Sequence, residues 1–325
     1  MDDEAFDEAV RAAYPGVTPL YMGRKRYWAD GGPDPLDLIV IFPVDEPVPH
    51  WHLVSLGLTK DGPADDAGRG RDFELSMRAV RSPGEDEPPN WTLNRLQGIG
   101  QYVAESGSAV RAGQQMDDGR PIPDTSDGAL EAWLFTVDAT FDPLLPFDVV
   151  QVTAMTRDEL QASRAWQADA WRPFMEEALG PELIIDPDRT SILDDPARAQ
   201  QVADGIARDG SSTNALLTER LEVRPNRRFP PRPPRVTLHD TTAERLGWAV
   251  AGRLPHGHTL TIHDYAGTHV HLVPGDAVAL NPSGGGHWEL VLDSAAVRWL
   301  IDDLSTEPGL RRPDELAPLE LDVRE

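Results

Sequence analysis

Histidines are the residues of this sequence that could most directly support chemistry. Six of the nine lie between residues 256 and 287. They are His256, His258, His263, His269, His271 and His287. His269 and His271 alternate along one expected strand, so their side chains share a face and could hold a metal ion with a third ligand. No histidine or carboxylate stands at a recurring ligand spacing beside them, so a polar sheet face is the competing interpretation.

Motifs that carry or activate a nucleophile are missing from the sequence. It has no G-x-S-x-G, S-x-x-K or P-loop pattern, and without cysteine it excludes thiol catalysis, disulfides and cysteine-ligated zinc. His50 and His52 flank Trp51 on one strand face and indicate a satisfied surface pair. We therefore expect no enzyme, no catalytic residue, no metal and no cofactor. A metal-dependent enzyme, such as a hydrolase built on the C-terminal histidines, is the alternative.

The chain carries a large negative charge. Its 325 residues have a formal net charge of −25, which repels nucleic acid and anionic membranes and attracts basic partners. No apolar run is long enough to cross a bilayer, and the opening "MDDEAFDEAV" is too acidic for a secretory signal. These features predict a cytoplasmic protein. Only Lys25 and Lys60 are lysines, and this preference for arginine indicates GC-rich, bacterial coding.

Hydrophobic patterning predicts a mixed domain over residues 1–212. Apolar runs and alternation indicate strands, and 3.6-residue periodicity with capping residues indicates helices. The strands are expected at 36–42, 51–58, 73–80, 131–137 and 147–155, and the helices at 2–13, 90–106, 157–179 and 196–209. In the strand at 73–80, polar residues alternate with apolar ones, which predicts one solvent-exposed face.

A proline- and arginine-rich stretch, "RPNRRFPPRPPR", separates this domain from a second one. It favours extended, exposed backbone, so residues 213–234 are expected to form a flexible linker, with a docking site for a proline-recognising domain as the alternative. Six short strand-like runs and a helix at 294–304 predict a smaller α/β domain at 235–310, followed by an acidic tail at 311–325. The expected fold class is α/β mixed (α+β), with two sheet-and-helix lobes joined by the linker.

The stretch "PPNWTLNRLQGIGQYV" (88–103) places two glycines inside a helical apolar row. Each costs a helix roughly 1 kcal/mol against alanine, so Gly98 and Gly100 predict the close approach of a neighbouring strand or partner. The stretch resembles a segment of the Suppressor of fused family. Further resemblance is found in "FELSMRAV", "FDVVQVTAMTRDELQASRAW", "ADGIARDGSS", "GRLPHGHTLTIHD" and "GHWELVLDSAAVRWLIDDL".

The resemblance implies a bacterial-type member of this family, with two mixed lobes, a proline-rich connection and protein binding in place of catalysis. Animal members bind transcription factors of the Hedgehog pathway and hold a short peptide as an extra strand between the lobes. Bacterial members have been proposed as immunity proteins that neutralise toxins. Tyr102 matches a tyrosine of the family's peptide groove. We therefore expect a basic protein or peptide partner that contacts Tyr102, Gln114 and Trp133 in the first lobe and Arg253 and His256 in the second.

Overall fold

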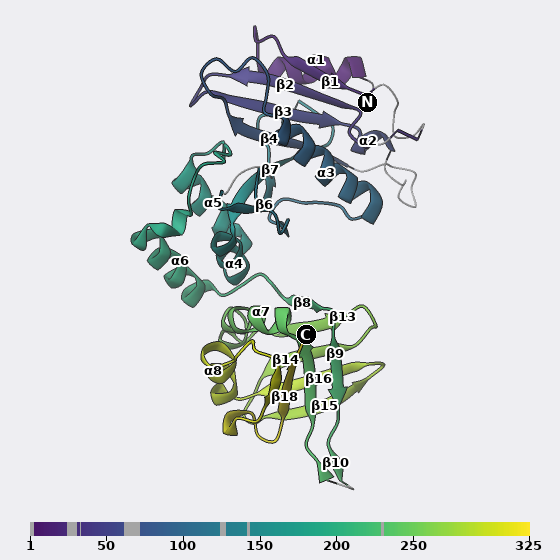
Figure 1. Ribbon diagram of the computed structural model, residues 1–325, viewed down its shortest axis with the longest axis vertical. Helices are drawn as coiled ribbons and strands as arrows, with labels where there is room; N and C mark the ends of the chain where they lie inside the picture. The colour runs from purple at the N-terminus through teal and green to yellow at the C-terminus, as the bar shows by residue number, and fades with distance from the viewer. Residues whose placement is uncertain are drawn as a thin grey trace. The chain divides into compact units, whose positions relative to one another are not determined.

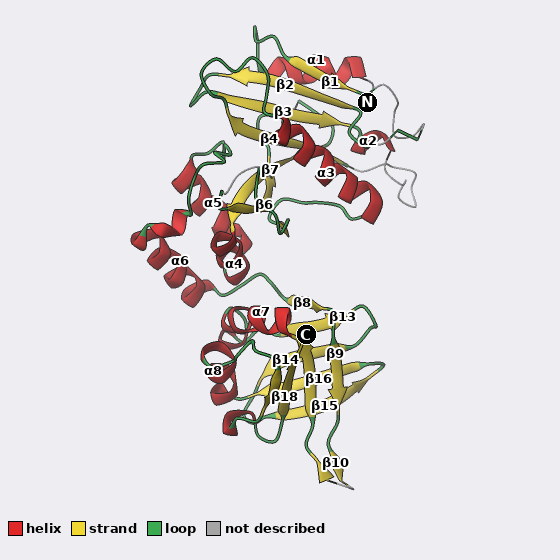
Figure 2. Cartoon of the chain, in the orientation of Figure 1, coloured by secondary structure: helices red, strands yellow, loops and turns green. Residues whose placement is uncertain are grey.

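The computed structural model contains two compact units of mixed helix and sheet (Figures 1 and 2), which confirms the expected fold class. It describes residues 3–24, 31–32, 34–61, 72–123, 128–141, 144–228 and 231–325. The first unit comprises Met1–Leu160 and Arg172–Asp194, and the second comprises Gln161–Trp171 and Asp195–Glu325. The helices are α1 (Asp3–Ala13), α2 (Leu58–Asp61), α3 (Asn90–Ser106), α4 (Arg157–Ala165), α5 (Ala168–Leu179), α6 (Pro196–Asp209), α7 (Asp240–Ala251) and α8 (Ser294–Asp302), with 3-10 turns η2 (Ile192–Asp194), η3 (Leu254–His256) and η4 (Asp314–Leu316).

A seven-stranded sheet forms the centre of the first unit. The strands are β1 (Leu20–Gly23), β2 (Leu38–Val44), β3 (His50–Leu56), β4 (Phe73–Val80), β5 (Gln115–Asp117), β6 (Leu130–Val137) and β7 (Asp148–Thr156). Their order is β1-β2-β3-β4-β7-β6-β5, and neighbours are antiparallel apart from the parallel pair β4 and β7. Among the described residues β5 pairs only with β6, so it forms one edge of the sheet.

Helices cover both faces of this sheet. On one face, apolar residues of α1 share a core with β2 and β3. On the other face, α3 packs on a larger core that includes residues of β2, β3, β4, β6 and β7. As a result Glu74, Ser76 and Arg78 of β4 are all buried. The predicted solvent-exposed face of this strand is therefore wrong, because Thr59, Asp138 and Thr140 from other segments bond to these three side chains.

The two glycines inside α3 have different surroundings. A Cβ added to Gly100 would lie 2.9 Å from Leu36 Cγ, so this glycine permits the close approach that its position predicts. A Cβ added to Gly98 would meet nothing within 4 Å. Gly98 therefore leaves an open space on the helix surface: no described strand approaches it, and the approach of a partner there stays a prediction. The helix ends at Gly107, whose φ of 68° is left-handed and favours glycine.

The predicted helix over 157–179 is divided into α4 and α5. The interruption falls at Trp166, whose Nε1 donates to Asp209 Oδ2 at 3.0 Å. A Cβ added to Gly205 of α6 would lie only 2.3 Å from the Trp166 indole, so α6 packs directly against this ring. Trp166, at the end of α4, is thus held by α6. The periodicity within 157–179 does not reveal this contact, because α6 lies outside that range.

In the described residues, the second unit contains α6, α7 and α8 together with a five-stranded, a four-stranded and a two-stranded sheet. The strands are β8 (Ala215–Thr218), β9 (Leu221–Arg224), β10 (Arg227–Arg228), β11 (Pro231–Arg232), β12 (Arg235–His239), β13 (Leu260–Asp264), β14 (His269–Pro274), β15 (Ala279–Gly284), β16 (His287–Leu292), β17 (Gly309–Arg311) and β18 (Glu320–Arg324). A five-stranded sheet has the order β15-β16-β14-β13-β8, and a four-stranded sheet has the order β17-β18-β12-β9. The apolar faces of both sheets share one core with α7 and α8.

The structure corrects two expectations about the ends of this unit. Much of the predicted linker at 213–234 is sheet, since β8 pairs with β13 and β9 pairs with β12. The predicted acidic tail at 311–325 is also wrong, because β18 lies between β12 and β17 with Leu321 and Val323 in the core. As a division into independently folding domains, the predicted boundaries stay predictions. Within the described residues, none of the helices combines the length and apolarity needed to cross a bilayer.

Candidate peptide-binding site

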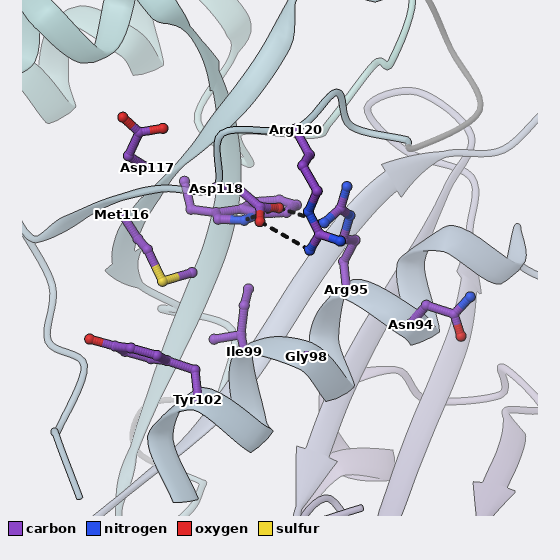
Figure 3. A pocket seen from close by; sticks show the side chains of 10 residues that line it. Asn94, Arg95, Gly98, Ile99, Tyr102, Met116, Asp117, Asp118 and Arg120 are labelled. Carbon is purple, nitrogen blue, oxygen red and sulfur yellow. Dashed lines mark hydrogen bonds and ion pairs between the residues drawn. The ribbon is translucent and has the colours of Figure 1, made fainter. Parts of the chain in front are cut away.

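A hollow in the first unit lies between α3 and the sheet edge formed by β5 and β6 (Figure 3). Its volume is about 590 Å³. The residues that shape it include Arg95, Gly98, Tyr102, Met116, Asp118 and Trp133. Because Gly98 has no side chain, the surface of α3 stays open at this point and the hollow can form.

Part-buried hydrogen bonds hold the base of the hollow. Trp133 is fully buried, and its Nε1 donates to Asp118 Oδ2 at 3.3 Å. Arg95 Nη1 donates to the same carboxylate oxygen at 2.6 Å, and Arg95 Nη2 donates to the carbonyl of Pro121 at 2.7 Å. Charge-assisted bonds of this kind fix side-chain geometry, so the base is rigid before any ligand binds.

Tyr102 stands on the rim of the hollow. Half of its surface (50%) is exposed, although its helix neighbours Ile99 and Val103 are buried. Met116 of β5 is partly buried and lies on the same side of the hollow as the Tyr102 ring (Figure 3). A partly exposed aromatic ring beside a flexible thioether forms an apolar surface that can adapt to a ligand.

Next to the hollow, the edge strand β5 presents backbone groups that have no partner among the described residues. Asp118 N donates to a β6 carbonyl at 3.2 Å, and Gln114 O accepts a β6 N–H at 3.0 Å. Hydrogen-bonded positions alternate along an antiparallel pair, so the even-numbered positions here face β6. Gln115 and Asp117 therefore direct their N–H and C=O groups away from β6, where a further strand can pair.

Charged side chains surround the edge. Arg157 donates from Nη1 to Asp117 Oδ2 and from Nε to Glu131 Oε1, both at 2.6 Å. The bond to Glu131 is the main cause that raises the pKa of the Arg157 guanidinium. Arg120 is largely exposed and reaches Asp118 at 3.4 Å. These ion pairs are mostly at the surface, so their charges remain accessible to a charged ligand.

Two of the three residues predicted in the first lobe line the hollow, namely Tyr102 and Trp133. Trp133 is also a core residue, as its apolar sequence neighbours favour. Gln114 does not line the hollow; its Oε1 accepts from the N–H of Arg111 at 2.9 Å and so builds the turn that leads into β5. Its contact with a partner stays a prediction.

Arg253 and His256, predicted in the second lobe, lie at η3 of the second unit. Arg253 Nη1 donates to the carbonyl of Ser211 at 2.7 Å, and His256 N donates to the carbonyl of Arg253 at 3.1 Å. A Cβ added to Gly210 would lie 2.9 Å from the His256 ring. Both residues therefore hold the turn at Gly210 and Ser211, and their role in binding stays a prediction.

Sequence reasoning missed Met116, Asp118 and Arg95 as components of the site. Met116 and Asp118 lie in or next to a three-residue strand, which is too short to show alternation. Arg95 follows the polar spacing of α3 but is 6% exposed. The one signal available was Gly98, because a glycine inside a helix indicates either a close approach or an open surface.

Four of the C-terminal histidines form a row on the sheet face opposite the core of the second unit. The rings of His269 and His287 stack with centroids 4.3 Å apart, and His263 stacks on His269 at 5.6 Å. His271 Nε2 lies 3.2 Å from His287 Nδ1, so these two nitrogens hydrogen-bond to each other, while the stacked pairs direct their in-plane lone pairs to different points. In the part of the chain that the structure describes, no group of three or more His, Cys, Asp or Glu side chains is arranged to hold a metal ion. The metal-dependent alternative thus gains no support from this row.

A second polar cluster lies inside the first unit. Asp138 Oδ2 lies 2.8 Å from His52 Nε2 and accepts from Ser76 Oγ at 2.6 Å, while its Oδ1 accepts from Arg78 Nη2 at 2.8 Å. Tyr14 Oη lies 2.6 Å from His52 Nδ1. These are the residue types of a catalytic triad, but Ser76 bonds to the carboxylate and not to the imidazole. With Asp138 only 1% exposed, no substrate can reach the cluster.

The prediction that His50 and His52 form a surface pair is wrong. They are 1% and 0% exposed, because α1 and the segment around Phe141 pack over this face of the sheet. Burial is the main cause that lowers the pKa of His52 to about 4 and also lowers the pKa of His50. Both imidazoles therefore stay neutral at physiological pH.

Comparison with known proteins places these features in a family. Residues 32–190 match the family model of Suppressor of fused protein (SUFU). The human and mouse proteins named Suppressor of fused homolog are each 30% identical to the chain over 213 residues. Both matches support the Suppressor of fused family, which the motifs of the sequence had indicated. The aligned part covers 59% of the chain and 44% of either relative, so the chain spans less than half the length of these Suppressor of fused proteins.

Solved structures of Suppressor of fused proteins share the fold. Drosophila Suppressor of Fused matches with a TM-score of 0.74 and 19% identity, and the match covers 99% of both chains. The Sufu–Fu complex matches with a TM-score of 0.54 and 24% identity, over 61% of this chain and 96% of the other. The hollow, β5 and the buried cluster all lie in the region that the family model matches, apart from Tyr14.

Proposed function

We propose that this chain is a non-enzymatic protein-binding module that holds an extended segment of a protein partner along the free edge of β5. The observation that carries the proposal is the combination of unpaired backbone groups at Gln115 and Asp117 with the adjacent hollow. One solved relative is a Sufu–Fu complex, in which a Suppressor of fused protein is joined to a protein partner. The match of residues 32–190 to the same family supports a similar role here.

Strand addition and the hollow would contribute different parts of the recognition. Backbone hydrogen bonds along β5 form with any extended sequence, so they supply affinity but little discrimination. The hollow, at about 590 Å³, lies in the range of roughly 300–1,000 Å³ typical of ligand pockets. With Tyr102 and Met116 at its rim and Trp133 at its base, it suits one large apolar or aromatic side chain of the partner.

The partner is expected to be basic overall. The formal net charge of −25 speeds encounter with a positively charged protein and repels acidic ones. In a bacterial cytoplasm, a basic toxin that this chain neutralises is the partner we propose, which would make the chain an immunity protein. Arg253 and His256 of the second unit, with Gln114, are the further contacts that the family resemblance suggests.

A peptide selected from a random displayed library against the full chain supplies a ligand with which to test the site. Truncating Tyr102 to alanine should weaken binding by about tenfold or more, because aromatic anchors in such pockets carry much of the binding energy. Tyr265→Ala, which removes an 81% exposed tyrosine of the second unit, is the matched control and should leave the affinity unchanged. Adding Arg253→Ala to Tyr102→Ala then measures the contribution of the second unit.

Amide exchange, followed by NMR on the same complex, tests the edge itself. Exchange at Gln115 and Asp117 should slow on binding, whereas exchange at Met116, whose position faces β6, should change little. Peptides that bind equally well to Tyr102→Ala, or that leave both odd-numbered amides unprotected, would place the binding site elsewhere.

A further inference from the structure

A second cavity, of about 270 Å³, lies on the outer face of the four-stranded sheet in the second unit. Its lining includes Arg220, Glu222, Arg224, Arg235, Asp322 and Arg324. The sheet register explains this gathering, because Arg224 pairs with Arg235, and Glu222 and Asp322 both pair with Thr237. Residues between them, such as Val236 and Leu321, point to the opposite face and into the core.

The charge of this cavity is opposite to that of the whole chain. Four guanidinium groups and two carboxylates line it, an excess of two positive charges in a protein with a formal net charge of −25. A negative net charge can be explained by solubility, but solubility does not explain a cluster of arginines in so acidic a protein. The excess therefore indicates a local requirement for an anionic group.

Buried ion pairs hold the arginines in place. Glu320 is almost fully buried; its Oε2 accepts from Arg224 Nη2 and Arg235 Nε, both at 2.9 Å, and its Oε1 accepts from Arg312 Nε at 2.7 Å. Burial raises the pKa of Glu320, but the bonds from Arg235 and Arg312 outweigh it and lower the pKa below its ordinary value. The carboxylate thus stays charged and fixes the guanidinium groups before a ligand binds.

Guanidinium donors remain available around the cavity. Arg220 is exposed, and its guanidinium has no hydrogen-bond partner among the residues that the structure describes. Within the described part of the chain, the Arg324 guanidinium donates only to Asp322 Oδ2, at 3.0 Å, and half of its side chain is exposed. The Asp322 side chain is 4% exposed, and its Oδ1 has no partner within the described residues. Each guanidinium has five N–H donors, so the two carboxylates of the cavity cannot satisfy them all.

We propose that this cavity binds a phosphate group, held mainly by Arg220 and Arg324. A phosphate monoester carries about −1.5 to −2 charges at pH 7, which matches the excess of two positive charges in the lining, whereas a carboxylate carries one. Its three terminal oxygens can accept from several guanidinium groups in bidentate geometry. The group can belong to free phosphate or to a phosphorylated side chain.

The test is titration of the full chain with inorganic phosphate, followed by calorimetry, and in parallel with a short phosphoserine peptide and its unphosphorylated form. The double variant Arg220→Ala with Arg324→Ala should weaken binding by about a hundredfold, since each charge-assisted bond contributes about tenfold or more. Arg298→Ala, an exposed arginine of α8, removes one charge outside the cavity and should change binding by less than twofold. Tyr102→Ala should bind phosphate normally, which separates this site from the edge of β5.

The two titrations distinguish a site for free phosphate from a site for a phosphorylated protein. Arginine-dependent binding of inorganic phosphate supports a site for the free ion, and arginine-dependent binding of the phosphopeptide alone supports a site for a modified protein. Acetate at equal concentration should not compete. The proposal is overturned if neither phosphate source binds, or if the double variant binds as tightly as the natural chain while its thermal melting is unchanged.

Discussion

Histidines on strands are buried in the first unit and partly exposed in the second. In the first unit, His50 and His52 of β3 are buried, and His52 bonds to Tyr14 and Asp138. In the second unit, His269 and His271 of β14 are separated by the same two-residue spacing but lie on a partly exposed face. Their rings stack with neighbouring histidines, and none of them is fully enclosed.

The difference arises from what packs on each sheet. Both faces of the seven-stranded sheet carry a core, so a polar side chain on either face must find partners within the protein. In the second unit, the described strands beside the histidine row place their apolar residues in a core on one face only, with α7 and α8. Alternation therefore shows which residues share a face, but the elements that cover that face decide whether they form a buried network or a solvated row.

The largest expected effect is the loss of the buried carboxylate. Replacing Asp138 by alanine leaves Arg78 buried without its ionic partner and removes acceptors from Ser76 and His52. Removing one partner of a buried ion pair typically costs about 3–5 kcal/mol, so the first unit should lose that much stability. Amide exchange of β3 and β4 measures this unit separately from the second.

The matched control is Asp302→Ala, an exposed aspartate of α8. It changes the net charge equally and should alter stability by less than about 0.5 kcal/mol. A small effect of Asp138→Ala, similar to that of the control, would show that the buried network is dispensable and that the contrast between the units is only geometric.

The elements of the fold were largely predictable because each has a local signal. The strand at 36–42 is a bracketed apolar run, and the helix expected at 196–209 has a proline in its first turn. The break at Trp166 and the burial of Glu74, Ser76 and Arg78 were not predictable, because both depend on contacts with distant segments. The strand β18 was not predictable either, because its acidic residues Glu320 and Asp322 are neutralised by arginines of the distant strands β9 and β12.

The candidate site was predictable only in part. Tyr102 and Trp133 were identified through the family resemblance, and both line the hollow. Met116 and Asp118 belong to a segment too short for pattern analysis, and the free edge of β5 is a property of sheet order, which no local pattern contains. Strand order depends on pairing between segments far apart in the chain, so it emerges only from the structure.

The next effect in size is the pH dependence of the first unit. The pKa of His52 is about 4 in the folded chain and about 6.5 when unfolded, with burial as the main cause. The unfolded chain therefore binds more protons between these values, and stability falls as the pH drops from 6.5 to 4. The shift corresponds to about 3 kcal/mol, measurable as faster amide exchange of β3 after correction for intrinsic rates. Asp138, whose pKa is lowered, would add to the loss only below about pH 4. Stability of the first unit that stayed constant over this window would contradict a neutral, buried His52.

The smallest expected effect comes from the exposed row. Burial, followed by repulsion from His287 and His269, lowers the pKa of His271, while Glu289 opposes the shift. The pKa of His271 is lowered, as that of His52 is, so protonation of His271 likewise reduces the stability of its unit as the pH falls below about 6.5.

His271→Gln keeps a polar group on this face and should make the stability of the second unit less dependent on pH between 7 and 5. His258→Gln, an exposed position outside the row, should not alter that dependence. Urea unfolding of both variants at pH 7 and pH 5 provides the measurement, and because His271 is partly solvated the change should be well below that for His52. An equal pH dependence in the two variants would mean that stacking, and not charge, governs this face.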